Sequence, residues 1–218
     1  MSAVTSGTKE TGAMNLQTRV TNILTKPKEE WPIIAAETTD VPTLYKSYIA
    51  ILAAIPPIGS FIGMSMIGVS LPILGTYRYG FAHGLTMAIV QYVLGLVGIY
   101  LAAFVIDKLA PTFQSQSSTI QALKLVAYAS TATWLAGVLN MIPALSVLGI
   151  LAGLYGIYLF YLGVSPLMKT PSEKVIPYMV VSAIVIIVVM VIVGACATAI
   201  TGAMFVGPGV GVQNFLDR

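Results

Sequence analysis

Residues 183–193 read Ala-Ile-Val-Ile-Ile-Val-Val-Met-Val-Ile-Val, and they lie within an apolar run from about Val175 to Phe205. A helix of about 20 apolar residues is long enough to cross the hydrocarbon core of a membrane, which is about 30 Å thick. No side chain in this stretch can pair with water, so lipid is its favourable environment. We therefore predict that the run spans a membrane.

Four more apolar runs of similar length precede this one. They cover about Tyr48–Leu71, Tyr79–Ile106, Ile120–Ile142 and Ala144–Leu167. Of the 218 residues, 57% are hydrophobic and 9% are charged, whereas about a quarter of the residues in a soluble domain are charged. The sequence predicts an all-α integral membrane protein, a bundle of about five transmembrane helices preceded by a short amphipathic N-terminal helix.

Polar and apolar stretches divide the chain into four parts. Residues 1–13 are small and polar and are predicted to be a disordered tail. Residues 14–41 form a cytoplasmic amphipathic segment, and residues 42–205 form the five-helix transmembrane domain. The Gly-rich residues 206–218 are predicted to be a short external tail.

The amphipathic segment has apolar residues at helical spacing. Leu16, Val20, Ile23 and Leu24 recur on one helical face, and Trp31 follows them. Such a helix can lie on the membrane surface, where tryptophan is a typical anchor. The same residues can instead pack against the cytoplasmic ends of the bundle, and the sequence leaves both arrangements open.

Small residues spaced four apart form flat stripes on three of the predicted spans. Because lipid chains are as apolar as leucine, helices in a membrane associate through close backbone packing and interhelical hydrogen bonds. The stripes therefore predict either helix packing within the chain or oligomerisation. They consist of Gly59 and Gly63 in the first span, Gly149 and Gly153 in the fourth, and Gly194, Thr198 and Gly202 in the fifth.

Two further features concern prolines and charges in the spans. Pro56 and Pro57 have no backbone N–H and predict a kink or break in the first span. Transporters bind ions or solutes beside such breaks, although a proline kink is the more ordinary explanation. Asp107 and Lys124 lie near the same ends of the second and third spans and predict an ion pair or, alternatively, side chains that extend separately to the membrane surface. A gating or proton-linked role is the less favoured alternative.

Reactive side chains are scarce in the predicted spans. His83 is the only histidine and Cys196 the only cysteine, and no carboxylate falls within a spanning core. Catalysis in a membrane needs a nucleophile with its base, paired carboxylates or several metal ligands. We therefore expect a protein that is not an enzyme and has no cofactor. The net charge of +3 comes from scattered lysines and arginines, so no nucleic acid is expected as a partner.

Several stretches resemble the bacterial branch of the Yip family, the Ypt/Rab-GTPase-interacting, Yip-one-domain membrane proteins. The resemblance covers about Asn15 to Gly202, and its most specific part is the hairpin of the third and fourth spans. It is carried by Lys26-Pro-Lys-Glu-Glu-Trp-Pro32, Ala127-Tyr-Ala-Ser-Thr131, Ile142-Pro143, Leu154-Tyr-Gly-Ile-Tyr158 and Tyr161-Leu-Gly163. It implies a five-span bundle with a cytoplasmic N-terminus.

The eukaryotic relatives are linked to Rab GTPases and to vesicle traffic between endoplasmic reticulum and Golgi, often as oligomers. This chain lacks the Asp-Leu-Tyr…Gly-Pro pattern of their cytoplasmic segments. The resemblance therefore does not support a Rab-type GTPase as a partner. It implies a location in a bacterial inner membrane and leaves the biochemical role open.

Two functions remain from the residues. The first is a non-enzymatic multipass scaffold or adaptor that assembles with itself or with other membrane proteins, as the small-residue stripes and the amphipathic segment suggest. The alternative is a transporter or channel for a small solute, an ion or a lipid, as the Pro56-Pro57 break suggests. A cavity that reaches the break would favour transport, and a filled core with exposed stripes would favour assembly. Membrane lipids are partners in either case.

The distribution of basic residues predicts the orientation. With five spans, Lys9, Arg19, Lys26, Lys28, Lys46, Lys108, Lys124, Lys169 and Lys174 share one side, and Arg78 and Arg218 lie on the other. Cytoplasmic loops carry the excess of Lys and Arg, so we expect a cytoplasmic N-terminus and an external C-terminus. Reporter fusions at both ends measure this directly. Two termini in the same compartment would contradict the five-span topology.

Overall fold

The computed structural model describes residues 15–71 and 75–205, so the predicted tails at residues 1–13 and 206–218 lie outside the described part. Five helices in it are long and apolar enough to cross a membrane. They cover Val41–Ile67, Phe81–Phe113, Thr119–Met141, Ala144–Met168 and Ser172–Met204. The predicted class, an all-α multipass membrane protein, is confirmed.

Two short helices precede the spans, α1 (Leu16–Thr25) and α2 (Pro27–Ala36). The side chain of Asn15 accepts a hydrogen bond from the backbone N–H of Gln17 at 3.1 Å and so begins α1. Pro27 occupies the start of α2, where its missing N–H costs nothing, and Glu29 and Glu30 follow in the first turn near the positive end of the helix.

The first span is assembled from five short helical pieces. They are α3 (Val41–Leu44), η1 (Tyr45–Ile49), α4 (Ala50–Ala53), α5 (Ile55–Phe61) and η2 (Ile62–Ile67). Asp40 caps the first piece by accepting from the N–H of Thr43, and the hydrogen bonds of Thr43 hold the pKa of Asp40 below its ordinary value. The span is interrupted at Ala54, two residues before Pro56.

A short β-hairpin connects the first two spans, and the sequence did not predict it. Gly68 has a φ of 84°, a conformation that favours glycine, and its N–H donates to the carbonyl of Gly63 at 2.7 Å. The chain then forms β1 (Val69–Leu71) and β2 (Gly75–Tyr77), which pair antiparallel with Ser70 opposite Thr76. The predicted first span, drawn to Leu71, was therefore too long at this end.

The other four spans are more regular. The second consists of α6 (Phe81–Leu109) and η3 (Ala110–Phe113). The third consists of α7 (Thr119–Ala129), α8 (Thr131–Ala136) and η4 (Gly137–Met141). The fourth consists of η5 (Pro143–Leu148) and α9 (Gly149–Met168), and the fifth is α10 (Ser172–Phe205).

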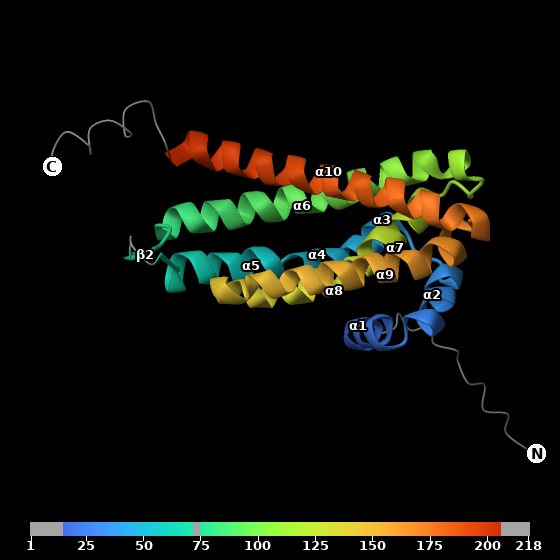
Figure 1. The fold of residues 1–218 in the computed structure, drawn as a ribbon, viewed down its shortest axis with the longest axis horizontal. Helices are drawn as coiled ribbons and strands as arrows, with labels where there is room; N and C mark the ends of the chain where they lie inside the picture. Colours follow the sequence, from blue (N-terminus) through green and yellow to red (C-terminus); the bar gives the residue numbers. More distant parts are fainter. Residues whose placement is uncertain (1–14, 72–74, 206–218) are drawn as a thin grey trace, which may run out of the picture.

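The spans form two layers that differ along their length (Figure 1). In one layer α10 runs along α6, and in the other α4, α5, α8 and α9 lie together. At one end α7 packs against both α6 and α9, and α1 and α2 cover the bundle beside it. We call this the closed end, and we call the opposite end, which carries the hairpin and the last turns of α10, the open end.

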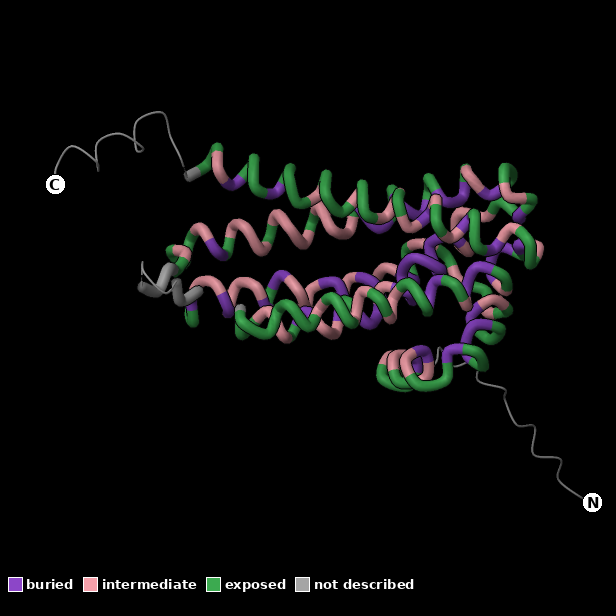
Figure 2. Tube along the Cα trace, viewed as in Figure 1, coloured by how far each residue is buried: buried purple, intermediate pink, exposed green. Residues whose placement is uncertain are grey.

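Burial follows the same division. Figure 2 shows the buried residues gathered at the closed end. In the most apolar window of the third span 67% of the residues are buried, whereas in that of the fifth span the share is 6%. The third span is therefore the central helix of the bundle, and the fifth is peripheral.

Tyrosine hydroxyls also join the spans. Tyr45 donates to the carbonyl of Leu96 at 2.8 Å, and Tyr92 donates back to the carbonyl of Ala50 at 2.9 Å. Tyr178 of α10 donates to the carbonyl of Ile106 at 2.7 Å. Interhelical hydrogen bonds of this kind stabilise a bundle in lipid.

The glycine stripe of the first span packs against the third span. A Cβ on Gly59 would lie 2.2 Å from the carbonyl oxygen of Gly137, and one on Gly63 would lie 2.0 Å from that of Asn140. The two backbones can approach this closely only because neither glycine has a side chain. This contact holds the first span against the central helix.

We expect Gly59→Ala or Gly63→Ala to lower the free energy of unfolding by about 1–3 kcal/mol, because the added methyl group overpacks a backbone contact. The matched control is Gly95→Ala, where no neighbour lies within 4 Å of the Cβ position. That variant should be neutral or slightly stabilising, since alanine favours helix over glycine. Thermal unfolding in detergent measures all three, and equal losses would contradict the close contact.

Candidate functional site

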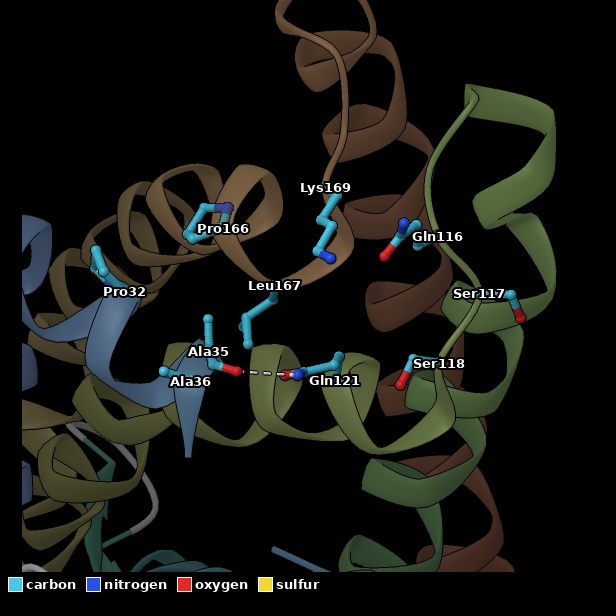
Figure 3. A pocket seen from close by; sticks show the side chains of 10 residues that line it. All are labelled: Pro32, Ala35, Ala36, Gln116, Ser117, Ser118, Gln121, Pro166, Leu167 and Lys169. Carbon is cyan, nitrogen blue, oxygen red and sulfur yellow. Dashed lines mark hydrogen bonds between the residues drawn. The ribbon is translucent and has the colours of Figure 1, made fainter. Parts of the chain in front are cut away.

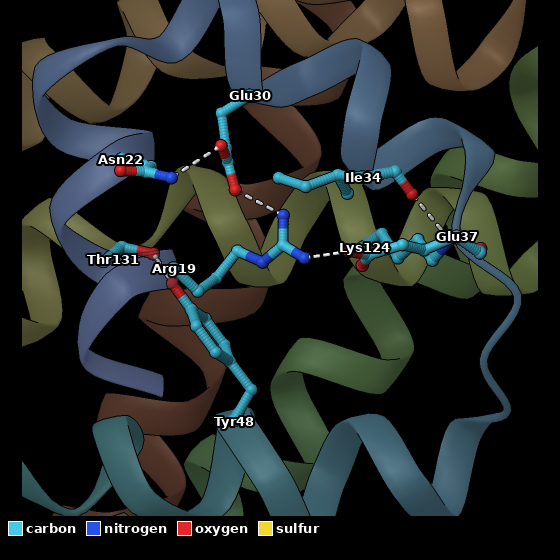
Figure 4. Close-up of polar contacts among 8 residues, drawn as sticks. All are labelled: Arg19, Asn22, Glu30, Ile34, Glu37, Tyr48, Lys124 and Thr131. Carbon is cyan, nitrogen blue, oxygen red and sulfur yellow. Dashed lines mark hydrogen bonds and ion pairs between the residues drawn. The ribbon is translucent and has the colours of Figure 1, made fainter. Parts of the chain in front are cut away.

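A buried cluster of charged side chains joins α1, α2 and α7 at the closed end (Figure 4). The Arg19 guanidinium of α1 makes ion pairs with Glu30 of α2 and with Glu37 just after α2. Arg19 is 4% exposed and Glu30 is 2% exposed. The side-chain amide of Asn22 donates to the second oxygen of Glu30 at 3.1 Å. Both carboxylate oxygens of Glu30 are therefore satisfied, as a buried charge requires.

Lys124 of α7 completes this cluster, and the predicted ion pair between Asp107 and Lys124 is wrong. The Lys124 ammonium donates to the carbonyls of Ile34, at 2.8 Å, and Glu37, at 2.5 Å. These carbonyls lie at the C-terminus of α2, where the helix dipole is negative and favours a cation.

Asp107 is satisfied elsewhere, by the connection between the second and third spans. Its two carboxylate oxygens accept from the hydroxyl of Ser117 at 2.6 Å and from that of Thr119 at 2.8 Å. The exposed Lys108 ammonium lies 3.9 Å away. Asp107 and Lys124 therefore bind different parts of the chain. Asp107 accepts from the connection before α7 and from the first residue of α7, and Lys124 donates to the end of α2.

Aromatic rings pack beneath the buried charged cluster, and we call them its floor. The Arg19 guanidinium lies 5.8 Å from the centre of the Tyr128 ring, a cation–π distance. The ring centroid of Tyr48 lies 4.4 Å from that of Tyr128, and the Tyr48 hydroxyl is 2.6 Å from that of Thr131. The floor thus connects the N-terminal segment to the first and third spans.

The predicted membrane-surface anchors lie against the protein rather than on the membrane surface. Trp31 is 1% exposed, packs edge-on against Tyr128 and covers Gly163, where a Cβ would meet its indole ring at 2.8 Å. Ile23 is fully buried, while Leu16, Val20 and Leu24 are half-buried against the core. The alternative expectation, packing on the bundle ends, describes this segment.

Tyr155 of α9 gives the segment one more attachment. Its hydroxyl donates to the carbonyl of Leu24, near the C-terminus of α1, at 2.6 Å. The N-terminal segment is therefore held by α7 through charges, by α9 through a hydroxyl and by an apolar face. Arg19, Glu30 and Glu37 were missed as site residues because partners so far apart in sequence leave no spacing signal.

A small polar pocket of about 520 Å³ lies next to the cluster (Figure 3). It is bordered by α2, the connection before α7 and the end of α9. The side-chain amide nitrogen of Gln121 donates to the carbonyl of Ala35 at 3.2 Å, and exposed Lys169 reaches over the pocket. Among the described residues, its lining contains no charged side chain other than Lys169.

A larger cavity of about 970 Å³ lies between the two layers, towards the open end from the buried core. We call it the membrane cavity. All five spans contribute to its lining, and Pro56 and Pro57 form part of the wall at the break in the first span. Its polar lining residues are few: Gln91, Ser130, Thr133, Thr198 and the indole of Trp134.

The predicted stripe glycines of α9 and α10 have no close neighbours, unlike those of the first span. No packed atom lies within 4 Å of the Cβ position of Gly149, Gly153, Gly194 or Gly202. For these four the predicted helix packing within the chain is wrong, because the facing helix is too distant, and oligomerisation stays a prediction. Gly153, Gly194 and Thr198 line the membrane cavity, whereas Gly149 and Gly202 do not.

Potential metal ligands do not cluster in the described residues. Residues 15–71 and 75–205 contain no group of three His, Cys, Asp or Glu side chains that could hold an ion. His83 lies near the open end, with its ring centroid 5.0 Å from that of Tyr79. The arrangement as a whole can hold a peptide segment through charges and can accommodate an apolar ligand between helices.

Five apolar spans, a docked N-terminal segment and a cavity at membrane depth define an integral membrane protein of the multipass helical class. The Yip1 domain matches residues 21–194. The chain therefore belongs to the Yip1 domain family, as its sequence predicted.

Two similar relatives carry the description "Inner membrane protein YohC", one from Escherichia coli strain K12 and one from Escherichia coli O6:H1 strain CFT073. Each is 25% identical to this chain over 158 residues, which is 71% of this chain and 81% of the relative. No solved structure matches the chain. The similarity agrees with the predicted class of location, an inner membrane protein.

We expect Arg19→Met to lower the free energy of unfolding by about 3–5 kcal/mol, because it leaves the buried Glu30 carboxylate without its cation. The double variant with Glu30→Met should regain much of this loss, since both charges leave together. Urea unfolding in mild detergent measures the loss in the single variant and its recovery in the double variant.

The matched control for this series is Lys28→Met, which removes the same charge from an exposed position of α2. Surface changes of this kind usually stay within about 0.5 kcal/mol. If Arg19→Met is no more destabilising than Lys28→Met, the ion pairs do not hold the segment.

Proposed function

We propose that this chain is a non-enzymatic membrane adaptor that assembles with itself or with other membrane proteins through the outer faces of α9 and α10. The observation that carries the proposal is the exposure of α10, whose most apolar window is 6% buried. Its inner contacts are chiefly with α6, so much of its circumference is available to another helix.

Gly149 of α9 and Gly202 of α10 support this assembly surface. Both have open space at the Cβ position and lie outside the cavity lining. A lipid-facing glycine allows a partner helix to approach the backbone closely, which is how helices associate where the hydrophobic effect gives no help. The proposed partner is therefore a transmembrane helix, from a second copy or from another protein.

The closed end supports the proposed orientation, with the N-terminus in the cytoplasm. The N-terminal segment and the connections after the second and fourth spans meet there. Most of the described basic residues lie in these parts or in the adjoining ends of the spans, whereas Arg78 lies at the open end. Cytoplasmic loops are enriched in Lys and Arg. The docked segment would then present the exposed sides of α1 and α2 to cytoplasmic partners.

The membrane cavity favours a second candidate function, the passage or binding of a small molecule in the bilayer. It reaches the Pro56-Pro57 break, the feature that motivated the transporter alternative. Its described lining contains no charged side chain, and ions in a membrane need charged or carbonyl ligands. This candidate is therefore an apolar solute or a lipid rather than an ion.

Replacing single glycines by isoleucine tests the adaptor proposal. We expect Gly149→Ile or Gly202→Ile to dissociate an oligomer, because the side chain holds the partner backbone away and no hydrophobic force compensates. Gly153→Ile and Gly194→Ile are matched controls that face the cavity, so the assembly state should be unchanged. The detergent-corrected mass of each purified variant measures it.

A wild-type chain that is monomeric in mild detergent and in nanodiscs, and that purifies without another membrane protein, would contradict the adaptor proposal. Equal dissociation by all four variants would mean that the substitutions disturb the fold rather than one surface. Thermal unfolding of each variant separates these two causes.

A further inference from the structure

We infer that the membrane cavity holds one acyl chain of a membrane lipid, which enters sideways between α9 and α10. This inference goes beyond the adaptor role and does not depend on it. It rests on the chemistry of the lining, the position of the opening and the dimensions of the cavity.

The lining offers few groups to a polar ligand, chiefly the side-chain amide of Gln91 and the indole N–H of Trp134. The hydroxyls of Ser130 and Thr133 donate to the carbonyls of Val126 and Ser130 in their own helices, both at 2.7 Å. Thr198 likewise donates to Ala195 at 2.9 Å. Their donors are occupied, and the rest of the wall is largely aliphatic, with Ile186, Met190 and similar side chains. Apolar cavities of this kind do not hold water.

The opening faces lipid. Some lining residues are strongly exposed, and they mark the opening of the cavity on the protein surface. Two of them show that the opening lies at α9 and α10. Ile150 is 64% exposed and Ile187 is 59% exposed. Both lie within helices long and apolar enough to span the membrane, so the molecules next to the opening are the acyl chains of lipids.

The length of the cavity is sufficient for an acyl chain. The lining extends along α10 from Met179 to Thr198, about 28 Å at 1.5 Å per residue. A lipid chain needs only about 15 Å, half the thickness of the hydrocarbon core.

An unfilled cavity of this size would also be costly, because the side chains around it lose van der Waals contacts on one side. The volume lies at the upper end of the roughly 300–1,000 Å³ typical of small-molecule sites. An acyl chain supplies these contacts from the surrounding medium. No ordering of a second protein is required.

The two tryptophans allow a direct test, because only one of them reports the cavity. Trp134 lines the cavity although it is 7% exposed, whereas Trp31 is buried at the closed end and does not line it. Trp31→Phe and Trp134→Phe each leave a single fluorophore. The chain is placed in nanodiscs of phosphatidylcholine with bromine atoms in the middle of the acyl chains, which quench a nearby indole.

We expect bromine to remove most of the Trp134 emission and little of the Trp31 emission. Gly153→Phe, added to the Trp31→Phe chain, places a large side chain in the cavity and should restore the Trp134 emission. Gly80→Phe, at the start of α6, is the control, because no atom lies within 4 Å of its Cβ position and it lines neither the cavity nor the proposed assembly surface. It should leave quenching unchanged.

Equal quenching of the two tryptophans, or unchanged quenching with Gly153→Phe, would overturn the inference. Native mass spectrometry of the delipidated chain is a second readout that keeps both tryptophans. A phospholipid should remain bound to the wild type and to Gly80→Phe and be lost from Gly153→Phe. Retention by all three, or by none, would also overturn it. The adaptor proposal is tested by Gly149 and Gly202 instead, so the two can fail separately.

Discussion

A helix surrounded by lipid gains nothing by exchanging lipid contacts for contacts with another apolar helix, and the whole bundle reflects this constraint. Beside the apolar side-chain core, several contacts between spans are a bare backbone or a hydrogen bond: Gly59 against Gly137, or the hydroxyls of Tyr45 and Tyr178 on carbonyls of α6. Away from the closed end α9 and α10 diverge (Figure 1), and both line the membrane cavity.

The fold could be predicted because run length alone decides whether a segment crosses a membrane. The break near Pro56 and the start of α2 at Pro27 could also be predicted, because a proline affects the backbone of its own helix and needs no distant partner. The β-hairpin was missed because its strands are too short to show an alternating pattern. Elements of a few residues depend on turn geometry more than on periodicity.

The candidate site was much less accessible to prediction. Spacing of four identifies a flat surface on a helix but not what faces it, so Gly63 and Gly153 looked alike although one meets a carbonyl and the other an open cavity. Lys124 was paired with the nearest plausible carboxylate, yet it bonds backbone carbonyls of a helix far away in sequence. Tertiary contacts of this kind are absent from any local pattern.

The charges of the buried cluster have a consequence for how firmly the N-terminal segment is attached. Arg19 and Lys124 carry two positive charges, and Glu30 and Glu37 carry two negative ones, so the attachment is electrically neutral as a unit. Most of these groups are shielded from solvent, and mobile ions weaken buried pairs much less than exposed ones. A helix held to a membrane by basic residues and anionic lipids would be released as ionic strength rises. We therefore expect the attachment of this segment to depend much less on ionic strength and on the lipid headgroups beneath it.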